Sequence, residues 1–253
     1  MMHDVQRANM WKRISAGFLD MILLIMLISL LAVILFEVFN YNAYISTLND
    51  KRDEYAQKYN ITFDITEEEL ASLQGEDEQR YLDALQALDS DAEFLYAYNM
   101  TTNMLLAVVA GSMFLSFLLL EFIVPLLFGN GQTLGKKIFG LALMRTDSVK
   151  LTNFALFVRS ILGKLTIETL IPVMLWISGT ITPIGVIAPV VTLGILGIQA
   201  GLLVASRNRA CIHDMMAVTV VIDYSSQMIF DSVEDLTKHK MQLAAEEAQR
   251  QEY

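Results

Sequence analysis

The sequence has little of what metal sites, redox centres and hydrolytic enzymes are commonly built from. Cysteine occurs once, as Cys211, and histidine three times in 253 residues. A single cysteine cannot close an internal disulfide, and the histidines lack the spacing of a zinc-binding pair. The sequence also lacks a Walker loop, a nucleophile elbow and a dinucleotide-binding fingerprint. We therefore expect no metal, no cofactor and no enzymatic activity.

Charged residues are nearly missing from four long stretches, and hydrophobic residues make up 54% of the chain. Residues 14–38 contain only Asp20 and Glu37 as charged residues, and they are long enough to cross a hydrocarbon core about 30 Å thick. This stretch is too long for a secretory signal and has no small-residue cleavage site, so we interpret it as a retained anchor. Further apolar stretches occupy residues 102–128 and, as a pair, residues 157–205. The pattern predicts an all-α membrane protein with a bundle of about four transmembrane helices.

Basic residues cluster at one end of each predicted span, which indicates the orientation of the chain. Lysine and arginine near span ends favour the cytoplasmic side of a membrane. We therefore expect both termini in the cytoplasm and residues 39–101 outside it. The basic residues that carry this prediction precede the first span, separate the second from the third, or follow the fourth: Arg7, Lys12, Arg13, Lys136, Lys137, Arg145, Lys150, Arg207 and Arg209.

These observations divide the chain into seven segments. Residues 1–13 form a cytoplasmic N-terminus, 14–38 the first span, and 39–101 an acidic, helical, extracytoplasmic insertion. Residues 102–128 form the second span, and 129–156 a cytoplasmic basic helix with strands. Residues 157–205 form a hairpin of the third and fourth spans, and 206–253 a cytoplasmic strand followed by a charged C-terminal helix.

The insertion at residues 39–101 is rich in carboxylates and accounts for much of the net charge of −10. Thr66 and Glu69 have the spacing of a capping box, and leucines recur from Leu70 to Leu88, so the segment is expected to be helical. It is either a solvated helical hairpin that caps the bundle or an acidic funnel that collects ligands. Nucleic acid is excluded as an expected partner by the charge.

The predicted cytoplasmic segments contain two strand-like runs. Residues 141–146 and 218–223 are short, largely apolar runs, and Asp147 with Ser148 follows the first as a turn. We expect the two runs to pair as a small β-hairpin or sheet beneath the membrane. Thr133 is positioned to cap a short basic helix, and Ser232 to open the C-terminal helix with Asp235 three residues later.

Four ionisable residues lie deep inside the predicted spans, whereas Glu37 and Arg159 lie nearer the span ends. The four are Asp20, Glu121, Lys164 and Glu168. Each costs about 2.5 to 3.5 kcal/mol on insertion scales, so such residues usually face a partner or a water-filled cavity. At the rise of an α-helix, Asp20 and Glu121 lie about 10 and about 12 Å from the cytoplasmic boundary. Lys164 and Glu168 are four residues apart and share a helix face. We interpret the four as a candidate ion or proton site.

Three acids against one deep base leave an excess of negative charge in this candidate site. A proton, a cation or a snorkelling arginine must relieve it, and Arg13 or Arg159 could supply the arginine. Three hypotheses stay open: an internal ion-pair network that fixes helix register, a proton or cation pathway, and recognition of a partner helix or lipid headgroup.

Glycines surround a basic pair at the start of the predicted cytoplasmic helix. Gly129, Gly131 and Gly135 could present backbone amides to phosphate, or they could form a tight turn. Lys136 and Lys137 suit contact with anionic lipid. The adjacent His213 and Asp214 are more typical of a cap or anchor than of a catalytic pair. Because four spans enclose only a small pathway, we expect a homo-oligomer or other membrane proteins as further partners.

Three stretches together resemble the RDD family of bacterial multi-pass inner-membrane proteins. They are residues 11–20 (WKRISAGFLD), 131–145 (GQTLGKKIFGLALMR) and 207–221 (RNRACIHDMMAVTVV). The resemblance assigns the arginine and the two aspartates of the family name to Arg13, Asp20 and Asp214, with Asp147 as the alternative for the last. Its other motif residues fall on Gly131, Gln132, Thr133, Gly135, Lys136 and His213.

The third stretch departs from the family pattern. Members often carry an arginine after the His-Asp pair and a small residue further on, where this chain has Met215 and Val218. The resemblance covers neither the acidic insertion nor the C-terminal tail. It implies a location in the bacterial inner membrane and a transport-related role, cation- or proton-coupled, through the buried carboxylates. The alternative is a non-transporting accessory or assembly subunit that binds other envelope proteins.

Overall fold

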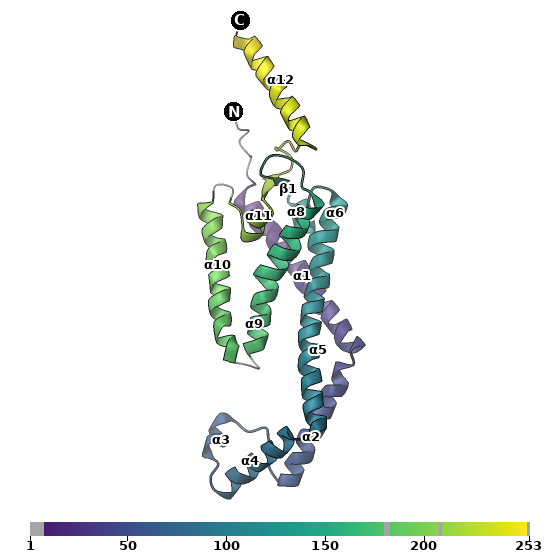
Figure 1. Cartoon of the computed structure of the whole chain (residues 1–253), viewed down its shortest axis with the longest axis vertical. Helices are drawn as coiled ribbons and strands as arrows, with labels where there is room; N and C mark the ends of the chain where they lie inside the picture. Colours follow the sequence, from purple (N-terminus) through teal and green to yellow (C-terminus); the bar gives the residue numbers. More distant parts are fainter. Residues whose placement is uncertain (1–7, 180–182, 207–208, 252–253) are drawn as a thin grey trace. The chain divides into compact units, whose positions relative to one another are not determined.

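The computed structural model describes residues 8–179, 183–206 and 209–251. The chain forms two compact units, one containing the residues up to Ser29 and from Ser112 onward, the other containing Leu30–Gly111. Within the described ranges, both units are helical apart from one two-stranded sheet in the first unit (Figure 1). The predicted fold class, a mainly helical bundle with a small sheet, is confirmed.

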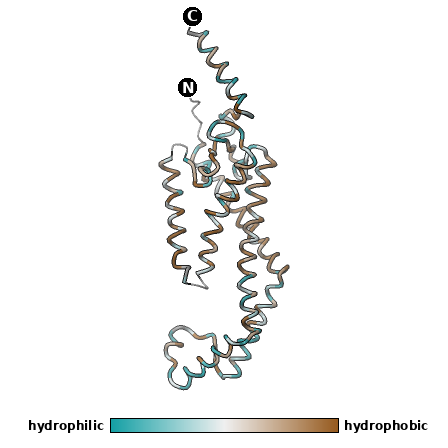
Figure 2. Tube along the Cα trace, viewed as in Figure 1, coloured by the Kyte–Doolittle hydropathy of each residue, from teal (hydrophilic) through white to brown (hydrophobic). Residues whose placement is uncertain are grey.

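Among the described residues, four helical stretches are long and apolar enough to cross a membrane, as predicted. Figure 2 shows the hydrophobic colouring that runs along them. The second and third stretches each combine several helical segments. In chain order the four are α1 (Met10–Val38); α5 (Ala92–Phe117) with η1 (Leu118–Ile123) and α6 (Val124–Phe128); α8 (Asn153–Phe157) with η2 (Val158–Leu170) and α9 (Ile171–Gly179); and α10 (Ala188–Ala205).

Two of these segments, η1 and η2, are π-helices rather than α-helices. In η2, the hydroxyls of Thr166 and Thr169 donate to the carbonyls of Ile161 and Lys164, five residues back, at 2.8 and 2.7 Å. π-Helical stretches are rare, usually limited to single turns, and frequent at functional sites. Their place in the second and third spans marks the part of the bundle where function is to be sought.

The fourth span begins with the helix α10 at Ala188, after a 3₁₀ segment, η3 (Pro183–Ile187). Residues 180–182, which belong to the predicted pair of spans, lie outside the described residues. Proline lacks a backbone N–H and fits only the first turn of an α-helix. Pro189 occupies that first turn in α10. The helices α9 and α10 contact each other as the predicted hairpin (Figure 1).

The small sheet joins two segments that flank the third and fourth spans. Strands β1 (Leu141–Arg145) and β2 (Thr219–Asp223) pair antiparallel, with Leu143 opposite Val221. Because two spans separate the strands in sequence, they form a sheet and not a hairpin. One face of the sheet packs with Ala16 of α1 and Leu156 of α8. The sheet therefore fixes the chain on either side of the third and fourth spans to the beginning of α1.

Two short helices flank the sheet. The helix α7 (Leu134–Ile138) begins at the Thr133 cap, as predicted, and α11 (Ile212–Met216) begins at Cys211. Gly131 has a positive φ of 61°, and a Cβ there would lie 2.8 Å from the side chain of Leu151. Only glycine fits this turn, which delivers Thr133 to its position. The C-terminal helix α12 (Val233–Gln251) is capped by Ser232, whose hydroxyl contacts Asp235 at 2.7 Å.

The second unit contains the acidic insertion, which is helical as predicted. Its helices are α2 (Tyr41–Tyr59), α3 (Glu67–Ser72) and α4 (Glu76–Asp89). The capping box of Thr66 and Glu69 is formed. Lys51 carries three of the unit's ion pairs, to Glu54, Asp91 and Glu93, at 3.1 to 3.4 Å. Figure 2 shows the hydrophilic colouring of much of its backbone trace, in contrast to the spans.

Candidate functional site

Asp20 of α1 is bound to the start of α7. One carboxylate oxygen accepts the backbone N–H of Gly135 at 2.7 Å, and the other accepts the hydroxyl of Thr133. A Cβ at Gly135 would lie 2.3 Å from the carbonyl oxygen of Ala16, so only glycine permits this approach of the two helices. Asp20 thus satisfies donors that a helix start otherwise leaves free.

Lys136 follows in α7 and is buried, with 7% of its surface exposed. Its ammonium donates to the Thr133 hydroxyl at 3.1 Å and lies 3.9 Å from the Asp20 carboxylate. Burial lowers the pKa of Lys136 to about 7, and nearby Lys164 adds to the effect, while Glu121 opposes it. A lysine with such a pKa changes charge close to neutral pH.

Glu121 lies in η1 and is 1% exposed. Its carboxylate accepts the ammonium of Lys164 in η2 at 2.7 Å. The Ser160 hydroxyl donates to the Glu121 carbonyl at 2.7 Å, which ties the two π-helices together. Asp20 and Glu121 border one small gap in the packing, which has no room for a water molecule, together with Leu23, Leu120 and Leu134. The two carboxylates that were placed at one depth therefore lie beside the same space.

Asp214 of α11 is the most completely paired acid of the site. It is 1% exposed, and Arg159 of η2 contacts its Oδ1 through Nε at 2.9 Å and Nη2 at 2.8 Å. Arg13 of α1 reaches its Oδ2 at 3.5 Å and donates to the Arg209 carbonyl at 2.8 Å. Burial alone would raise the pKa of Asp214, but the guanidinium of Arg159 outweighs it and holds that pKa well below its usual range.

Glu168, at the end of η2, pairs with His213 and not with Lys164. The backbone N–H and the Nδ1 of His213 lie 3.0 and 2.9 Å from its carboxylate. Burial, with Arg159 nearby, lowers the pKa of His213. A Cβ at Gly163 would lie 2.7 Å from the Cβ of His213, so glycine is needed for α11 to approach η2. The four-residue spacing predicted a shared face but not these separate partners.

The surplus of negative charge predicted for the site is not found among these residues. The sequence pattern indicated one deep base, Lys164, but Arg159 is 2% exposed and Lys136 is buried as well. Residues five apart are hydrogen-bond partners in a π-helix and lie one turn apart, so Arg159 and Lys164 both face the site. The network contains four carboxylates and four cationic groups, namely Asp20, Glu121, Glu168 and Asp214 with Arg13, Lys136, Arg159 and Lys164.

A cavity of about 270 Å³ opens beside the network. Charged groups from α1, α7, η2 and α11 line it together with apolar residues. Its charged lining residues are Arg13, Asp20, Lys136, Arg159, Lys164 and Asp214. Met10, Ile14 and Leu203 are among the apolar ones. Charged side chains of a membrane protein therefore line a cavity that is large enough for water molecules.

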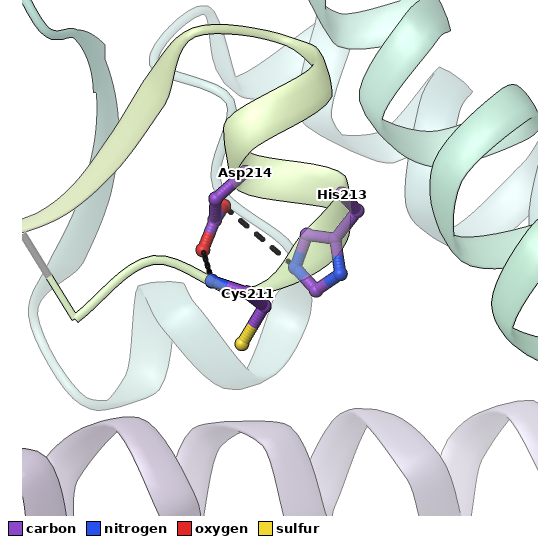
Figure 3. A group of neighbouring side chains, drawn as sticks. All are labelled: Cys211, His213 and Asp214. Carbon is purple, nitrogen blue, oxygen red and sulfur yellow. Dashed lines mark hydrogen bonds and ion pairs between the residues drawn. The ribbon is translucent and has the colours of Figure 1, made fainter. Parts of the chain in front are cut away.

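Cys211, His213 and Asp214 form a cluster with potential metal ligands within 4.8 Å of one another (Figure 3). The carboxylate of Asp214 accepts the Cys211 backbone N–H at 3.2 Å, and its other oxygen lies 3.7 Å from His213 Nε2. Both oxygens already contact arginines, and burial raises the pKa of Cys211 to about 11. A protonated thiol and a paired carboxylate are poor metal ligands, so the donor set suits a helix cap and an ion-pair centre.

The side chain of Lys136 is buried in the network and lines the cavity, not an exposed surface, and its contact with anionic lipid stays a prediction. Lys137 is exposed, with its ammonium 3.6 Å from the centroid of the Phe128 ring. The amide of Gly135 binds Asp20, so it is not available to phosphate. Gly129 and Gly131 have positive φ and form the tight turn.

The structure favours one of the two choices for the second motif aspartate. Asp147 is exposed and pairs with Arg145 at 2.7 Å, whereas Asp214 is buried against Arg13 and Arg159, so Asp214 fits this position. Arg207, which contributed to the predicted orientation, lies outside the described residues.

Comparison with known protein families gives a match over most of the chain. The family model described as the RDD family matches residues 7–218 of the chain. No curated protein and no solved structure was found to match. The matched region contains the whole charged network and, between its first and second spans, the acidic insertion.

Proposed function

This chain belongs to the RDD family, and we propose that it is a transport-related protein of the bacterial inner membrane, driven by a proton or cation. The proposed pathway runs through the buried carboxylates Asp20 and Glu121 and their cationic neighbours Lys136 and Lys164. The role is proposed to be non-enzymatic, with both termini in the cytoplasm.

One observation carries the proposal: a cavity is lined by charged side chains in a bundle of membrane spans, where burying a charge costs free energy. Ionisable groups inside spans are rare and commonly mark ion pathways and proton relays. Glu121 and Lys164 lie in π-helices of the second and third spans, and Lys136 and Lys164 line the cavity. An ion-pair network that only holds helices together does not need a cavity beside it that is large enough for water.

Lys136 supplies the coupling step in this proposal. Burial brings its pKa to about 7, so gain or loss of one proton is accessible at cellular pH. When Lys136 loses its proton, four carboxylates face three cationic groups, and the site again carries an excess of negative charge. That excess favours the return of a proton to the site and weakens the attraction between α7 and α1.

The test is proton flux in liposomes that contain the purified protein, measured under an imposed pH gradient with Na⁺, K⁺ or Li⁺. Wild type is compared with Asp20→Asn and Glu121→Gln, and Asp147→Asn serves as the matched control because that carboxylate is exposed. We expect flux in wild type and in the control, and loss of flux in both buried variants while they still elute as folded protein. Absence of wild-type flux with all three cations contradicts the proposal.

The alternative is a non-transporting accessory subunit that binds other envelope proteins. The complete pairing of buried charges favours it, because a balanced network suffices to fix helix register. The oligomeric state separates the two functions further. A symmetric oligomer with the cavities facing its axis supports transport, whereas a stable monomer in detergent supports the accessory role.

A further inference from the structure

The cavity beside the network is lined by more positive than negative charge. Four of its lining residues are cationic and two are acidic, which leaves a formal surplus of two positive charges on its wall when Lys136 is protonated: Arg13, Lys136, Arg159 and Lys164 against Asp20 and Asp214. Glu121, which balances Lys164, does not line this space. The balanced network therefore presents an electropositive surface to the cavity.

The two lysines have hydrogen-bonding capacity beyond their contacts within the described residues. An ammonium carries three donors. Lys164 donates one to Glu121, and Lys136 donates one to Thr133 while Asp20 lies 3.9 Å away. Arg159, in contrast, directs two nitrogens at Asp214. The donors available to a ligand are thus those of Lys136 and Lys164.

The electrostatics of Lys136 point to an anion as the occupant. Desolvation and the positive charges of Lys164 and Arg159 on η2 oppose its protonation, and Glu121 on η1 and Asp20 on α1 favour it. The opposing effects win, and its pKa falls to about 7. An anion placed between the two ammonium groups would offset their repulsion and restore the charge on Lys136.

We infer that this cavity binds a phosphate monoester or inorganic phosphate, held by Lys136 and Lys164 with Arg13 beside them. Such a group carries close to two negative charges at neutral pH, which matches the surplus on the cavity wall. Its oxygens accept several charge-assisted hydrogen bonds at once. Met10, Ile14 and Leu203 provide an apolar side for the remainder of the ligand. The ligand is a soluble phosphate compound or the phosphomonoester head of a lipid.

This inference rests on the proposed function only in treating the bound group as what is moved, since binding is measured without transport. The first experiment titrates inorganic phosphate into the purified full-length protein in neutral detergent, by calorimetry and by thermal unfolding, with NaCl at matched ionic strength as reference. Saturable binding is expected. Lys136→Gln and Lys164→Gln should weaken it by about tenfold or more, because each removes a charge-assisted hydrogen bond.

Lys137→Gln is the matched control, since Lys137 is the next residue and is exposed. It should bind phosphate as wild type does. Equal weakening in Lys136→Gln and Lys137→Gln overturns the inference, because it would report surface charge only.

A parallel arm uses nanodiscs of phosphatidylcholine with and without phosphatidic acid. Stabilisation by phosphatidic acid alone assigns the site to a lipid head, and stabilisation by free phosphate assigns it to a soluble ligand. The absence of both effects overturns the inference.

A third arm uses only wild-type protein, so that misfolding of a variant cannot obscure the result. Sulfate keeps its charge between pH 6 and about 9, whereas Lys136 does not. Sulfate binding should weaken above pH 7 by a factor that approaches about tenfold per pH unit, because one proton is taken up with the anion. Binding that does not change with pH overturns the role of Lys136. Proton flux without anion binding refutes this inference alone, and anion binding without flux refutes the transport proposal alone.

Discussion

The two units of this protein contain ion pairs of equal length in opposite surroundings. In the second unit, Arg52 lies 2.8 Å from Asp64, whose side chain is 88% exposed. In the first, Arg159 lies 2.8 Å from Asp214, with side chains 2% and 1% exposed. Water and salt weaken the first pair, and both partners stay solvated when it breaks. Neither partner of the second pair becomes solvated in this way when that pair breaks.

This difference shows where charge can act as a switch. Exposed pairs of the acidic insertion form and separate with small changes in free energy. A buried charged group that loses its partner must pair with it again, be neutralised by a proton transfer or bind a new counter-ion. The proton on Lys136 and the occupant of the cavity are therefore coupled through the network of the first unit.

The largest effect is expected when one partner of each pair is removed. Asp214→Ala leaves Arg159 buried and unpaired, and it should lower the free energy of unfolding by about 3 to 5 kcal/mol. Asp64→Ala, the matched control, should cost less than about 1 kcal/mol. Chemical unfolding in detergent measures both. The double variant Arg159→Met with Asp214→Leu should recover much of the loss, and similar losses for the two single variants would erase the contrast between the units.

A smaller effect separates two threonines that cap helices, Thr66 in the second unit and Thr133 in the first. Thr66→Ala removes an exposed cap and should cost about 1 kcal/mol. Thr133→Ala also deprives Asp20 and Lys136 of a hydroxyl that both contact. Its expected loss is about 2 to 4 kcal/mol, because hydrogen bonds to charged groups add to the cap. Thr133→Ser, which keeps the hydroxyl, should retain most of the stability in thermal unfolding; a loss as large as that of Thr133→Ala would contradict this account.

Much of the fold could be predicted because it depends on local patterns. Uninterrupted apolar stretches identified the four spans, and the caps at Thr66, Thr133 and Ser232 follow from hydroxyl residues before helical runs. The sheet followed from two short, largely apolar runs. The start of α10 depends on Pro183 and Pro189, since hydropathy alone does not register the restriction that proline places on a helix.

The candidate site was predicted only in part, since partners depend on rotation as well as depth. The depth of Asp20 and Glu121 follows from helical rise, but the α-helical spacing used for Lys164 and Glu168 does not hold in a π-helix. That change brings Arg159 into the site, a residue assigned to the interface by its position. Gly135 and Gly163 were a readable signal of close helix approach, but their partners Ala16 and His213 are distant in sequence.

The finest contrast between the units is the sign of the pH dependence that two lysines impose. Ion pairing to Glu93 and Glu54 raises the pKa of Lys51, so folded protein holds its proton more tightly than unfolded protein. The stability from Lys51 is present below the unfolded pKa and is lost as pH rises through the folded one. Lys136 has the opposite sign. Its folded pKa of about 7 lies below the unfolded value, so unfolded chains bind more protons between these two values and stability increases with pH there.

The contribution of Lys136 should therefore appear as a difference between wild type and Lys136→Met in unfolding experiments across pH 6 to about 10. The difference in the free energy of unfolding should change by at most about 1.4 kcal/mol per pH unit, the slope of one proton. Below pH 7 the methionine variant gains most over wild type, because it avoids burying a charge. Lys51→Met should change stability in the opposite direction, and only at the alkaline end. If phosphate occupies the cavity, it keeps Lys136 protonated, so adding phosphate should move the wild-type transition to higher pH and leave the variant unchanged.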